Sequence, residues 1–167
     1  EPDRTPGSSA VRKTVTVLFC DLVGSTAFGE QVDAESAREA IGRYHTMARS
    51  AIEHAGGAVE KFIGDGVMAL FGAPLAHEDH AQRACHAALA IQQAVGRFGE
   101  KVSHDYGIAF KMRLGLNSGP VIVEAIGDDL RMEYTAIGDT TNLASRMEKN
   151  CPPRSILIDE LTYEGIR

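Results

Sequence analysis

The sequence lacks several features, and each absence excludes a class of protein. No apolar run among its 167 residues approaches the roughly 18 or more residues that a membrane-spanning helix needs. Basic residues are outnumbered, because 17 Lys and Arg stand against 23 Asp and Glu and leave a formal net charge of -6. Nucleic-acid binders neutralise phosphates with clustered Lys and Arg, so we expect no nucleic-acid partner. A small phosphate ligand remains open, provided that metal ions supply positive charge locally.

Cysteine is scarce and shows no motif. The three cysteines, Cys20, Cys85 and Cys151, are odd in number and scattered, and no C-x-x-C spacing occurs. This distribution is typical of a reduced, cytoplasmic compartment and argues against a disulfide framework or a zinc site. The remaining composition, with 44% hydrophobic and 24% charged residues, is ordinary for a soluble globular domain.

The first residues differ in composition from the rest. Residues 1–10, EPDRTPGSSA, are rich in Pro, Gly and Ser and lack the charged and apolar regions of a signal peptide. We expect a flexible linker over residues 1–12 and one folded domain over residues 13–167, long enough to bury a hydrophobic core. A linker at this place indicates that the domain is part of a larger protein.

Hydrophobic periodicity predicts a mixed fold. The run KTVTVLFC is typical of a buried strand, and apolar residues three and four apart over residues 33–55 indicate an amphipathic helix. The predicted strands cover residues 13–20, two segments within 58–71, 110–116, 121–126, 132–137 and 155–158, and further helices cover 77–98 and 139–150, the latter capped by Asp139. Hairpins adjoin helical crossovers without strict alternation, so we expect an α+β fold with a mostly antiparallel sheet and flanking helices.

A polar turn follows the first predicted strand. Asp21 stands at its end, where a carboxylate is costly unless it is solvated or meets a cation. The following Gly24-Ser25-Thr26 can aim backbone N–H groups at a phosphate. An ordinary turn, in which Ser25 or Thr26 caps a helix, is the alternative.

A second carboxylate lies at a predicted hairpin tip. Asp65, within Ile63-Gly64-Asp65-Gly66, can come to lie beside Asp21. Two converging carboxylates suit Mg²⁺ ions, which take oxygen ligands and bridge phosphates. A plain turn remains the alternative, because the Gly-Asp dipeptide recurs at 127–128 and 138–139.

The last predicted helix carries an amide and a guanidinium on one stripe. Asn142 and Arg146 are four residues apart, whereas Leu143 and Met147 would face the core. Such a pair can hold a ribose and a charged phosphoryl group. A solvated polar face, with Arg146 paired to a nearby acid, is the alternative.

Two other groups have a structural and a functional interpretation. His77 and His80 lie three residues apart, which would suit zinc, but they stand at a predicted helix start, so we favour a capping role. Arg113 lies within a predicted strand, and the sequence leaves a phosphate ligand and an exposed strand residue equally open.

Four motifs, taken together and in order, carry a resemblance that no single segment does. They read LFCDLVGST, EKFIGDGVMALFG, MRLGLNSG and EYTAIGDTTNLASRME. This series resembles the catalytic domain of class III adenylate and guanylate cyclases from about Lys13 onward, nearly the whole chain. The resemblance implies a ferredoxin-like core that works as a head-to-tail homodimer. It also implies that the later strands of the family, which bear a phosphate-binding lysine, are missing after Arg167.

The resemblance implies a role for each matched residue. Asp21 and Asp65 match the pair that binds two divalent metal ions, Mg²⁺ or Mn²⁺. Asn142 matches the ribose-orienting asparagine and Arg146 the transition-state arginine. The implied substrate contacts are Lys61 and Thr135 for the purine, Arg113 for the polyphosphate, and Leu22, Val23, Gly24, Ser25 and Thr26 for the phosphates. In family dimers one chain supplies the metal aspartates and the other supplies the purine readers, the asparagine and the arginine.

The implied activity is that of an adenylate cyclase. The ribose 3′-hydroxyl attacks the α-phosphorus of ATP with metal assistance, which yields 3′,5′-cyclic AMP and pyrophosphate. Lys61 can donate to adenine N1 and the Thr135 hydroxyl can accept from the 6-amino group, whereas guanylate cyclases typically carry glutamate and cysteine there. Threonine at this position resembles a subgroup with bicarbonate-responsive members, so bicarbonate is a hypothetical activator. A guanylate cyclase, or a non-catalytic sensor domain that binds nucleotide or only dimerises, is the alternative.

Overall fold

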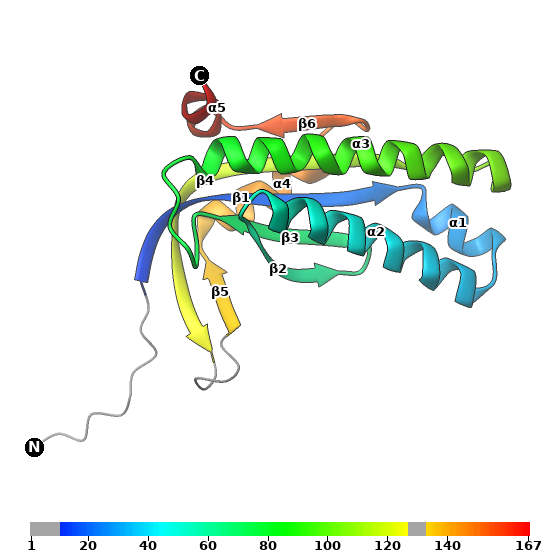
Figure 1. Ribbon diagram of the computed structural model, residues 1–167, viewed down its shortest axis with the longest axis horizontal. Coiled ribbons are helices and arrows are strands. Elements are labelled where there is room, and N and C mark those ends of the chain that lie inside the picture. The colour runs from blue at the N-terminus through cyan, green and yellow to red at the C-terminus, as the bar shows by residue number, and fades with distance from the viewer. Residues whose placement is uncertain (1–10, 127–132) are drawn as a thin grey trace, which may run out of the picture.

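The computed structural model describes residues 11–126 and 133–167 (Figure 1), and the side chains of residues 124–126 and 133–137 are left out of that description. The elements are β1 (Val11–Val23), α1 (Ser25–Gln31), α2 (Ala34–His54), β2 (Ala58–Ile63), β3 (Gly66–Phe71), α3 (His80–Tyr106), β4 (Lys111–Ile126), β5 (Glu133–Ile137), α4 (Asp139–Asn150), β6 (Ser155–Ile158) and α5 (Glu160–Ile166). Within these ranges, no helix has the length and apolar character that crossing a membrane requires.

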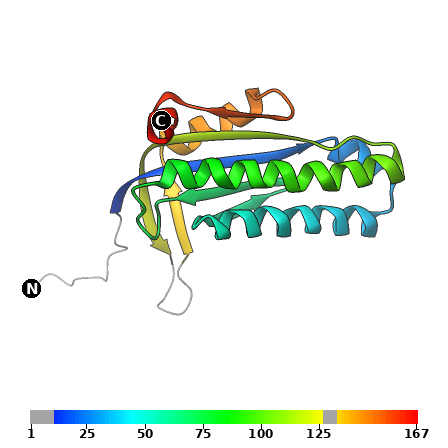
Figure 2. The ribbon, with the colours of Figure 1, turned by 45° about the horizontal axis from the view of Figure 1, so that its top comes forward.

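One six-stranded sheet organises the chain, with the order β2-β3-β1-β4-β5 and with β6 paired to β4. Every pairing is antiparallel except that of β4 with β6. Helices α2 and α3 run side by side over one face of the sheet, and α4 lies against the other (Figures 1 and 2). The predicted α+β fold with a mostly antiparallel sheet is confirmed.

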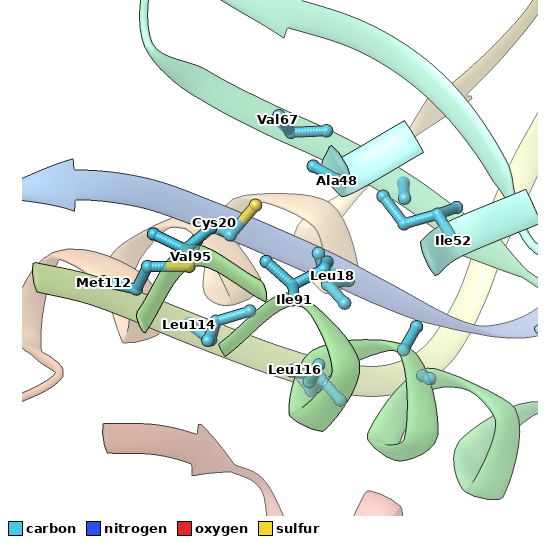
Figure 3. Packing of buried hydrophobic residues seen from close by; sticks show 14 of the residues in the cluster. Leu18, Cys20, Ala48, Ile52, Val67, Ile91, Val95, Met112, Leu114 and Leu116 are labelled. Atoms are coloured by element: carbon cyan, nitrogen blue, oxygen red, sulfur yellow. The ribbon is translucent and has the colours of Figure 1, made fainter. Parts of the chain in front are cut away.

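The main core lies between the sheet and the α2–α3 pair. Strand β1 sends Leu18, Cys20 and Leu22 into this face, since alternate residues of a strand point the same way. Ile52 of α2 and Ile91 of α3 meet them there, as Figure 3 shows. The predicted periodicity of three and four in α2 is confirmed by its buried stripe, Ala40, Tyr44, Ala48 and Ile52.

Strand β4 is a single long strand, so the predicted break at Asn117-Ser118-Gly119-Pro120 is wrong. The partner strand β1 pairs along nearly all of it, from Val11 opposite Val123 to Val23 opposite Lys111. In the described sheet, β6 pairs β4 over residues 113–116 and β5 pairs it over 122–126. Pro120 falls between these two partners, where a missing backbone N–H is tolerated as on an edge strand.

The helices differ from the prediction in the bounds of α3, in the cap of α4 and in the presence of α5. Helix α3 begins at His80 rather than His77 and continues past residue 98 to Tyr106, because Gly99 fits where α3 meets Phe110 and does not break the helix. Helix α4 has Gly138 as N-cap, so Asp139 is its first residue and not its cap. The residues after β6, for which no element was predicted, form the helix α5.

Candidate functional site

The end of β1 and the β2–β3 turn bring Asp21 and Asp65 together. Cys20 of β1 pairs with Val67 of β3, so the next residue of β1 lies beside the turn that carries Asp65. The Ser25 hydroxyl donates a hydrogen bond to the Asp65 carboxylate, which ties the turn after β1 to the same hairpin. Burial and the adjacent Asp65 carboxylate raise the pKa of Asp21 to about 6.

The aspartate pair fits a divalent cation. Asp21 Oδ1 is buried and has no hydrogen-bond partner, so an acceptor faces inward with nothing to accept from. Among the described residues, no group of three or more His, Cys, Asp and Glu side chains could hold a metal ion, so the donor set here is two carboxylates. Mg²⁺ is commonly bound by one or two carboxylates and completes its shell with water and substrate phosphates.

The predicted zinc alternative at His77 and His80 finds no support in the geometry. His80 Nδ1 lies 2.7 Å from Thr16 Oγ1 and is engaged in a hydrogen bond. The predicted helix start within His77-Glu78-Asp79-His80 is confirmed in position, but the structure shows no side-chain capping bond there. The N-cap position of α3 belongs to Asp79, whose side chain makes no capping bond and pairs instead with Arg83 at 2.7 Å.

The turn after β1 packs closely against the backbone at Ala109. Gly24 has φ 103, and a Cβ there would lie 2.7 Å from the Ala109 carbonyl oxygen, so only glycine fits. Gly24 is also the N-cap of α1, which corrects the alternative in which Ser25 or Thr26 caps a helix. Leu22 is buried in the main core, so only its backbone can contact a phosphate.

Helix α2 supports the hairpin that carries Asp65. The His45 ring stacks on Phe62 of β2 with a centroid separation of 4.3 Å. Tyr44 Oη lies 3.3 Å from Cys20 Sγ, one residue before Asp21. Burial lowers the pKa of His45, and the negative charge of Asp65 opposes that shift. No sequence motif links α2 to the site.

Arg113 lies opposite Asp21 in the β1–β4 register and joins a buried cluster. Its Nη2 is 3.4 Å from Asp21 Oδ2, its Nε is 3.4 Å from Glu148 Oε1, and its Nη1 donates to the Lys149 carbonyl at 3.2 Å. Glu148, on α4, is only 5% exposed. Burial and the charge of Asp21 raise the pKa of Glu148 to about 7, and Arg113 opposes this.

Glu148 is the functional candidate that the sequence interpretation missed. Its signal was available, since Ala144 and Glu148 are four residues apart on the face of α4 that packs on the sheet. Arg113, in turn, is not the exposed strand residue of one predicted alternative, and its role as a phosphate ligand stays a prediction. It is largely buried and paired with acids of its own chain.

A β-bulge fixes the face on which Lys61 lies. The β2–β3 register shifts between Val59 and Lys61, so Lys61 pairs with Met68 and Phe62 with Val67. Met68 faces the α4 side, so Lys61 is exposed on that side and Phe62 packs against the main core. Regular pairing beyond Val59 would reverse the two. The Thr135 side chain, the other predicted purine reader, lies outside the described residues.

Asn142 and Arg146 lie on the exposed face of α4, as predicted. The inner face, however, consists of Thr140, Ala144 and Glu148 and not of Leu143 and Met147. Leu143 is 42% exposed, so its predicted core role is wrong.

The physical reason is the glycine on β4 beneath α4. A Cβ on Gly115 would lie 2.8 Å from the Ala144 carbonyl oxygen and 2.5 Å from the Glu148 nitrogen. Backbone therefore approaches backbone, and small residues are selected at the contact.

The predicted residues form two groups in one chain. Asp21, Asp65, Ser25 and Arg113 are linked by direct contacts. No hydrogen bond or ion pair within residues 11–126 and 133–167 joins Lys61, Asn142 or Arg146 to that group. A cavity of about 580 Å³ between β4, α4 and α5 includes Asp139 and Leu143 in its wall but none of the predicted site residues. Within the described residues, the aspartate pair and the exposed α4 residues are therefore two separate polar groups of one chain.

Comparisons with known proteins identify relatives of this chain. A family model described as the adenylate and guanylate cyclase catalytic domain matches residues 8–167. Adenylate cyclase 1 of Rhizobium meliloti (strain 1021) is 32% identical over 142 residues, 85% of this chain and 21% of that protein. Guanylate cyclase soluble subunit beta-2 of Homo sapiens is 30% identical over 156 residues, 93% of this chain and 24% of that protein.

A solved structure of a cyclase also has a similar fold. The crystal structure of the adenylyl cyclase CyaB from P. aeruginosa superposes with a TM-score of 0.87 at 32% identity, over 95% of this chain and 82% of that one. The chain spans between 7% and 28% of the length of the first curated relatives that it matches.

Proposed function

The chain belongs to the adenylate and guanylate cyclase catalytic-domain family, and from that premise we propose that it converts ATP to 3′,5′-cyclic AMP and pyrophosphate. The observation that carries the proposal is the Asp21–Asp65 pair, two carboxylates that meet at the end of β1 with a buried oxygen left unbonded. Two divalent metal ions, Mg²⁺ or Mn²⁺, would supply a lowered pKa for the ribose 3′-hydroxyl and neutralise charge on the polyphosphate. Asp21 and Asp65 are the residues that would hold them.

Asn142 and Arg146 supply the remaining polar groups of the reaction. Arg146 is exposed on α4 and, among the described residues, takes part in no ion pair, so its guanidinium is free to meet charge that develops on the α-phosphoryl oxygens. Asn142, one turn earlier, can hold the ribose so that its 3′-hydroxyl points at the α-phosphorus. Both contributions rise in the transition state, so they act on turnover more than on substrate binding.

A second copy of the chain completes the site. Asn142 and Arg146 lie apart from the aspartate pair in one chain, so we propose a homodimer in which each chain's α4 and Lys61 face the partner's aspartates. The arrangement is self-complementary and yields two identical sites per dimer. The lack of any hydrogen bond or ion pair between the two groups, within the described part of one chain, supports this proposal.

Lys61 and Thr135 favour ATP over GTP. An ammonium group donates to adenine N1, and a threonine hydroxyl accepts from the 6-amino group. That hydroxyl can also donate to a guanine carbonyl, so the discrimination is expected to be softer than with a carboxylate. Because both adenylate and guanylate cyclases are among the relatives, the base preference is the first property to measure.

Two further proposals concern the setting of the reaction. We propose a cytoplasmic location, where ATP and Mg²⁺ are abundant and the three free cysteines stay reduced. Bicarbonate is proposed as an activator from the threonine at position 135 alone. Activity that bicarbonate leaves unchanged at constant pH would remove that hypothesis.

Product analysis tests the proposed reaction. ATP and GTP are supplied separately with Mg²⁺ or Mn²⁺, over a range of protein concentrations, and cyclic nucleotides are quantified by chromatography. The expected outcome is cyclic AMP, with a specific activity that rises with protein concentration as dimers form. Equal yields from GTP contradict the base preference. ATP binding without any cyclic product favours the non-catalytic sensor domain instead.

Mixing two inactive variants tests the shared site. Asp21→Asn retains Arg146, and Arg146→Ala retains both aspartates, so a mixed dimer rebuilds one intact site. Random pairing at equal amounts predicts recovery of up to about a quarter of wild-type activity. Mixing Arg146→Ala with Asn142→Ala is the matched control and is expected to recover nothing, since both lesions lie on the same half-site.

A further inference from the structure

Arg113 is shared between three acceptors, with a hydrogen bond to the Lys149 carbonyl, a long hydrogen bond to Asp21 and a long ion pair to Glu148. Its guanidinium reaches Asp21 at 3.4 Å, Glu148 at 3.4 Å and the Lys149 carbonyl at 3.2 Å. Charge-assisted N–H···O bonds normally close to about 2.7–2.9 Å, so both carboxylate contacts are long. The Arg113 guanidinium therefore lies between the α4 acceptors, Glu148 and the Lys149 carbonyl, and the Asp21 carboxylate.

Glu148 is fixed in place by the packing of α4. The helix backbone touches β4, since a Cβ on Gly115 would meet the Glu148 nitrogen at 2.5 Å. The carboxylate is 5% exposed, and its Oε1 has no hydrogen-bond partner, only the long ion pair with Arg113. A buried ion pair of this kind is weak evidence for stability, because desolvation offsets the attraction. A role in holding Arg113 explains its presence better.

We propose that Glu148 is a positioning residue which, with the Lys149 carbonyl, holds the Arg113 guanidinium back from Asp21 and so keeps the Asp21 carboxylate available to a divalent cation. Without that hold, Arg113 would close on Asp21 Oδ2 and neutralise more of the negative charge that the carboxylate offers to a metal ion. The inference rests on the proposed function only in taking Asp21 as a metal ligand.

The first test measures metal binding directly. Mn²⁺ is titrated into the protein without nucleotide, and free Mn²⁺ is followed by electron paramagnetic resonance. A pH of about 8.5 keeps Glu148 ionised, above the pKa of about 7 that burial gives it. Glu148→Gln keeps the shape but removes the charge, and we expect Mn²⁺ binding to weaken about threefold to tenfold with little change in Tm. Glu148→Asp, which restores the charge, is expected to recover part of the affinity.

A double-mutant cycle tests whether Glu148 acts through Arg113. Arg113→Gln removes the competing cation, so Mn²⁺ binding is expected to tighten. In that background Glu148→Gln should have no further effect. An equal loss of affinity in both backgrounds means that Glu148 attracts the metal by its own charge, and it overturns the proposal. Glu164→Gln, on the exposed face of α5, is the control for a carboxylate far from the cluster.

The outcomes separate this inference from the proposed reaction. Mn²⁺ affinities that follow the cycle while no cyclic nucleotide forms would overturn the proposed reaction and leave the role of Glu148 standing. Cyclic AMP formation with the same metal requirement in wild type and Glu148→Gln overturns the role of Glu148 alone. A lower Tm for Glu148→Gln with unchanged Mn²⁺ binding shows a purely structural residue and also overturns it. If wild-type protein binds no Mn²⁺ at millimolar concentration, Asp21 is not a metal ligand and the proposal is overturned.

Discussion

The two faces of the sheet differ in the side chains that fill them. On the α2–α3 face, large apolar side chains such as Leu18, Ile91 and Leu114 interlock with little polar content. On the α4 face, a second apolar cluster that includes Val15, Val17 and Leu70 packs with Ala144. Close backbone contact at Gly115 and a polar cluster of Asp21, Arg113 and Glu148 distinguish this face from the other. The same strand, β1, serves both faces through alternate residues. The larger core therefore lies on one face of the sheet, and the polar cluster lies on the other.

This separation predicts that substitutions on the two faces have different effects. A change on the α2–α3 face lowers the free energy of unfolding and leaves the catalytic constants of the folded protein alone. A change on the exposed side of α4 does the reverse. Residues at the α4–β4 contact should affect both. Four substitutions, in order of decreasing effect, probe the comparison.

Arg146→Ala should show the largest effect. Loss of one group that stabilises transition-state charge typically lowers kcat by about 10²–10³-fold. Tm should stay within experimental error, because the side chain is exposed and packs on nothing in the core. Steady-state kinetics with ATP and thermal unfolding of the same samples test this. Arg43→Ala, an exposed arginine on α2, should change neither quantity, and a large drop in Tm for Arg146→Ala would break the comparison.

Ile91→Ala should lower the free energy of unfolding by about 2–5 kcal/mol, since the side chain is fully buried and leaves a cavity. Urea unfolding gives the value, and KM for ATP of the folded fraction should match wild type. Leu89→Ala, on the same helix but at a residue 50% exposed, should stay within about 0.5 kcal/mol of wild type. Similar losses for the two leucine-sized truncations would contradict the assigned core face.

Gly115→Ala should affect stability and activity together. The added methyl would lie 2.5 Å from the Glu148 nitrogen and must push α4 off the sheet. Overpacking of this kind costs about 1–3 kcal/mol, and displacement of Glu148 should also raise the metal concentration needed for activity. Gly119→Ala meets the Thr140 side chain rather than backbone, so its effect should be smaller. Full activity of Gly115→Ala at wild-type metal concentration would show that α4 can move without consequence.

Gly96→Ala should give the smallest change and with the opposite sign. The residue lies within α3, and a Cβ there would meet nothing within 4 Å. Replacing an exposed helical glycine by alanine stabilises by about 0.5–1 kcal/mol. Gly99→Ala, one turn later, would meet the Phe110 carbonyl at 3.2 Å and should lose that gain. Equal stabilisation by Gly96→Ala and Gly99→Ala would mean that α3 does not pack tightly against Phe110.

The sequence predicted the fold class and most elements because their signals are local. Periodicity located α2, and the β2–β3 hairpin was found from its Gly-Asp-Gly turn. Long-range partners decided what local signals missed. Strand β4 crosses Asn117 to Pro120 without a break because β1 pairs alongside it. Asp139 was read as a cap from its residue type, yet Gly138 takes that position.

The same distinction holds for the candidate site. Asp21 and Asp65 were each ambiguous alone, and their proximity follows from the β1–β3 pairing that only the sheet supplies. Leu143 was assigned to the core from its apolar side chain, but the contact with Gly115 selects the small Ala144 instead. Glu148 is not predicted from the sequence because a glutamate on a helix usually faces solvent. Its burial depends on how α4 packs against β4.

The bulge at Glu60 gives β2 an unusual tolerance to changes in length. It absorbs one residue between Val59 and Lys61, so Phe62 and Asp65 keep their pairing with β3 whatever happens upstream. A chain with one residue fewer at this point could pair regularly and still present Lys61 and Asp65 as they are now. Related sequences are therefore best aligned here by counting back from the Asp65 tip rather than forward from the end of α2. A single-residue gap just before Lys61 is expected to leave Lys61 and Asp65 on the faces that they occupy now.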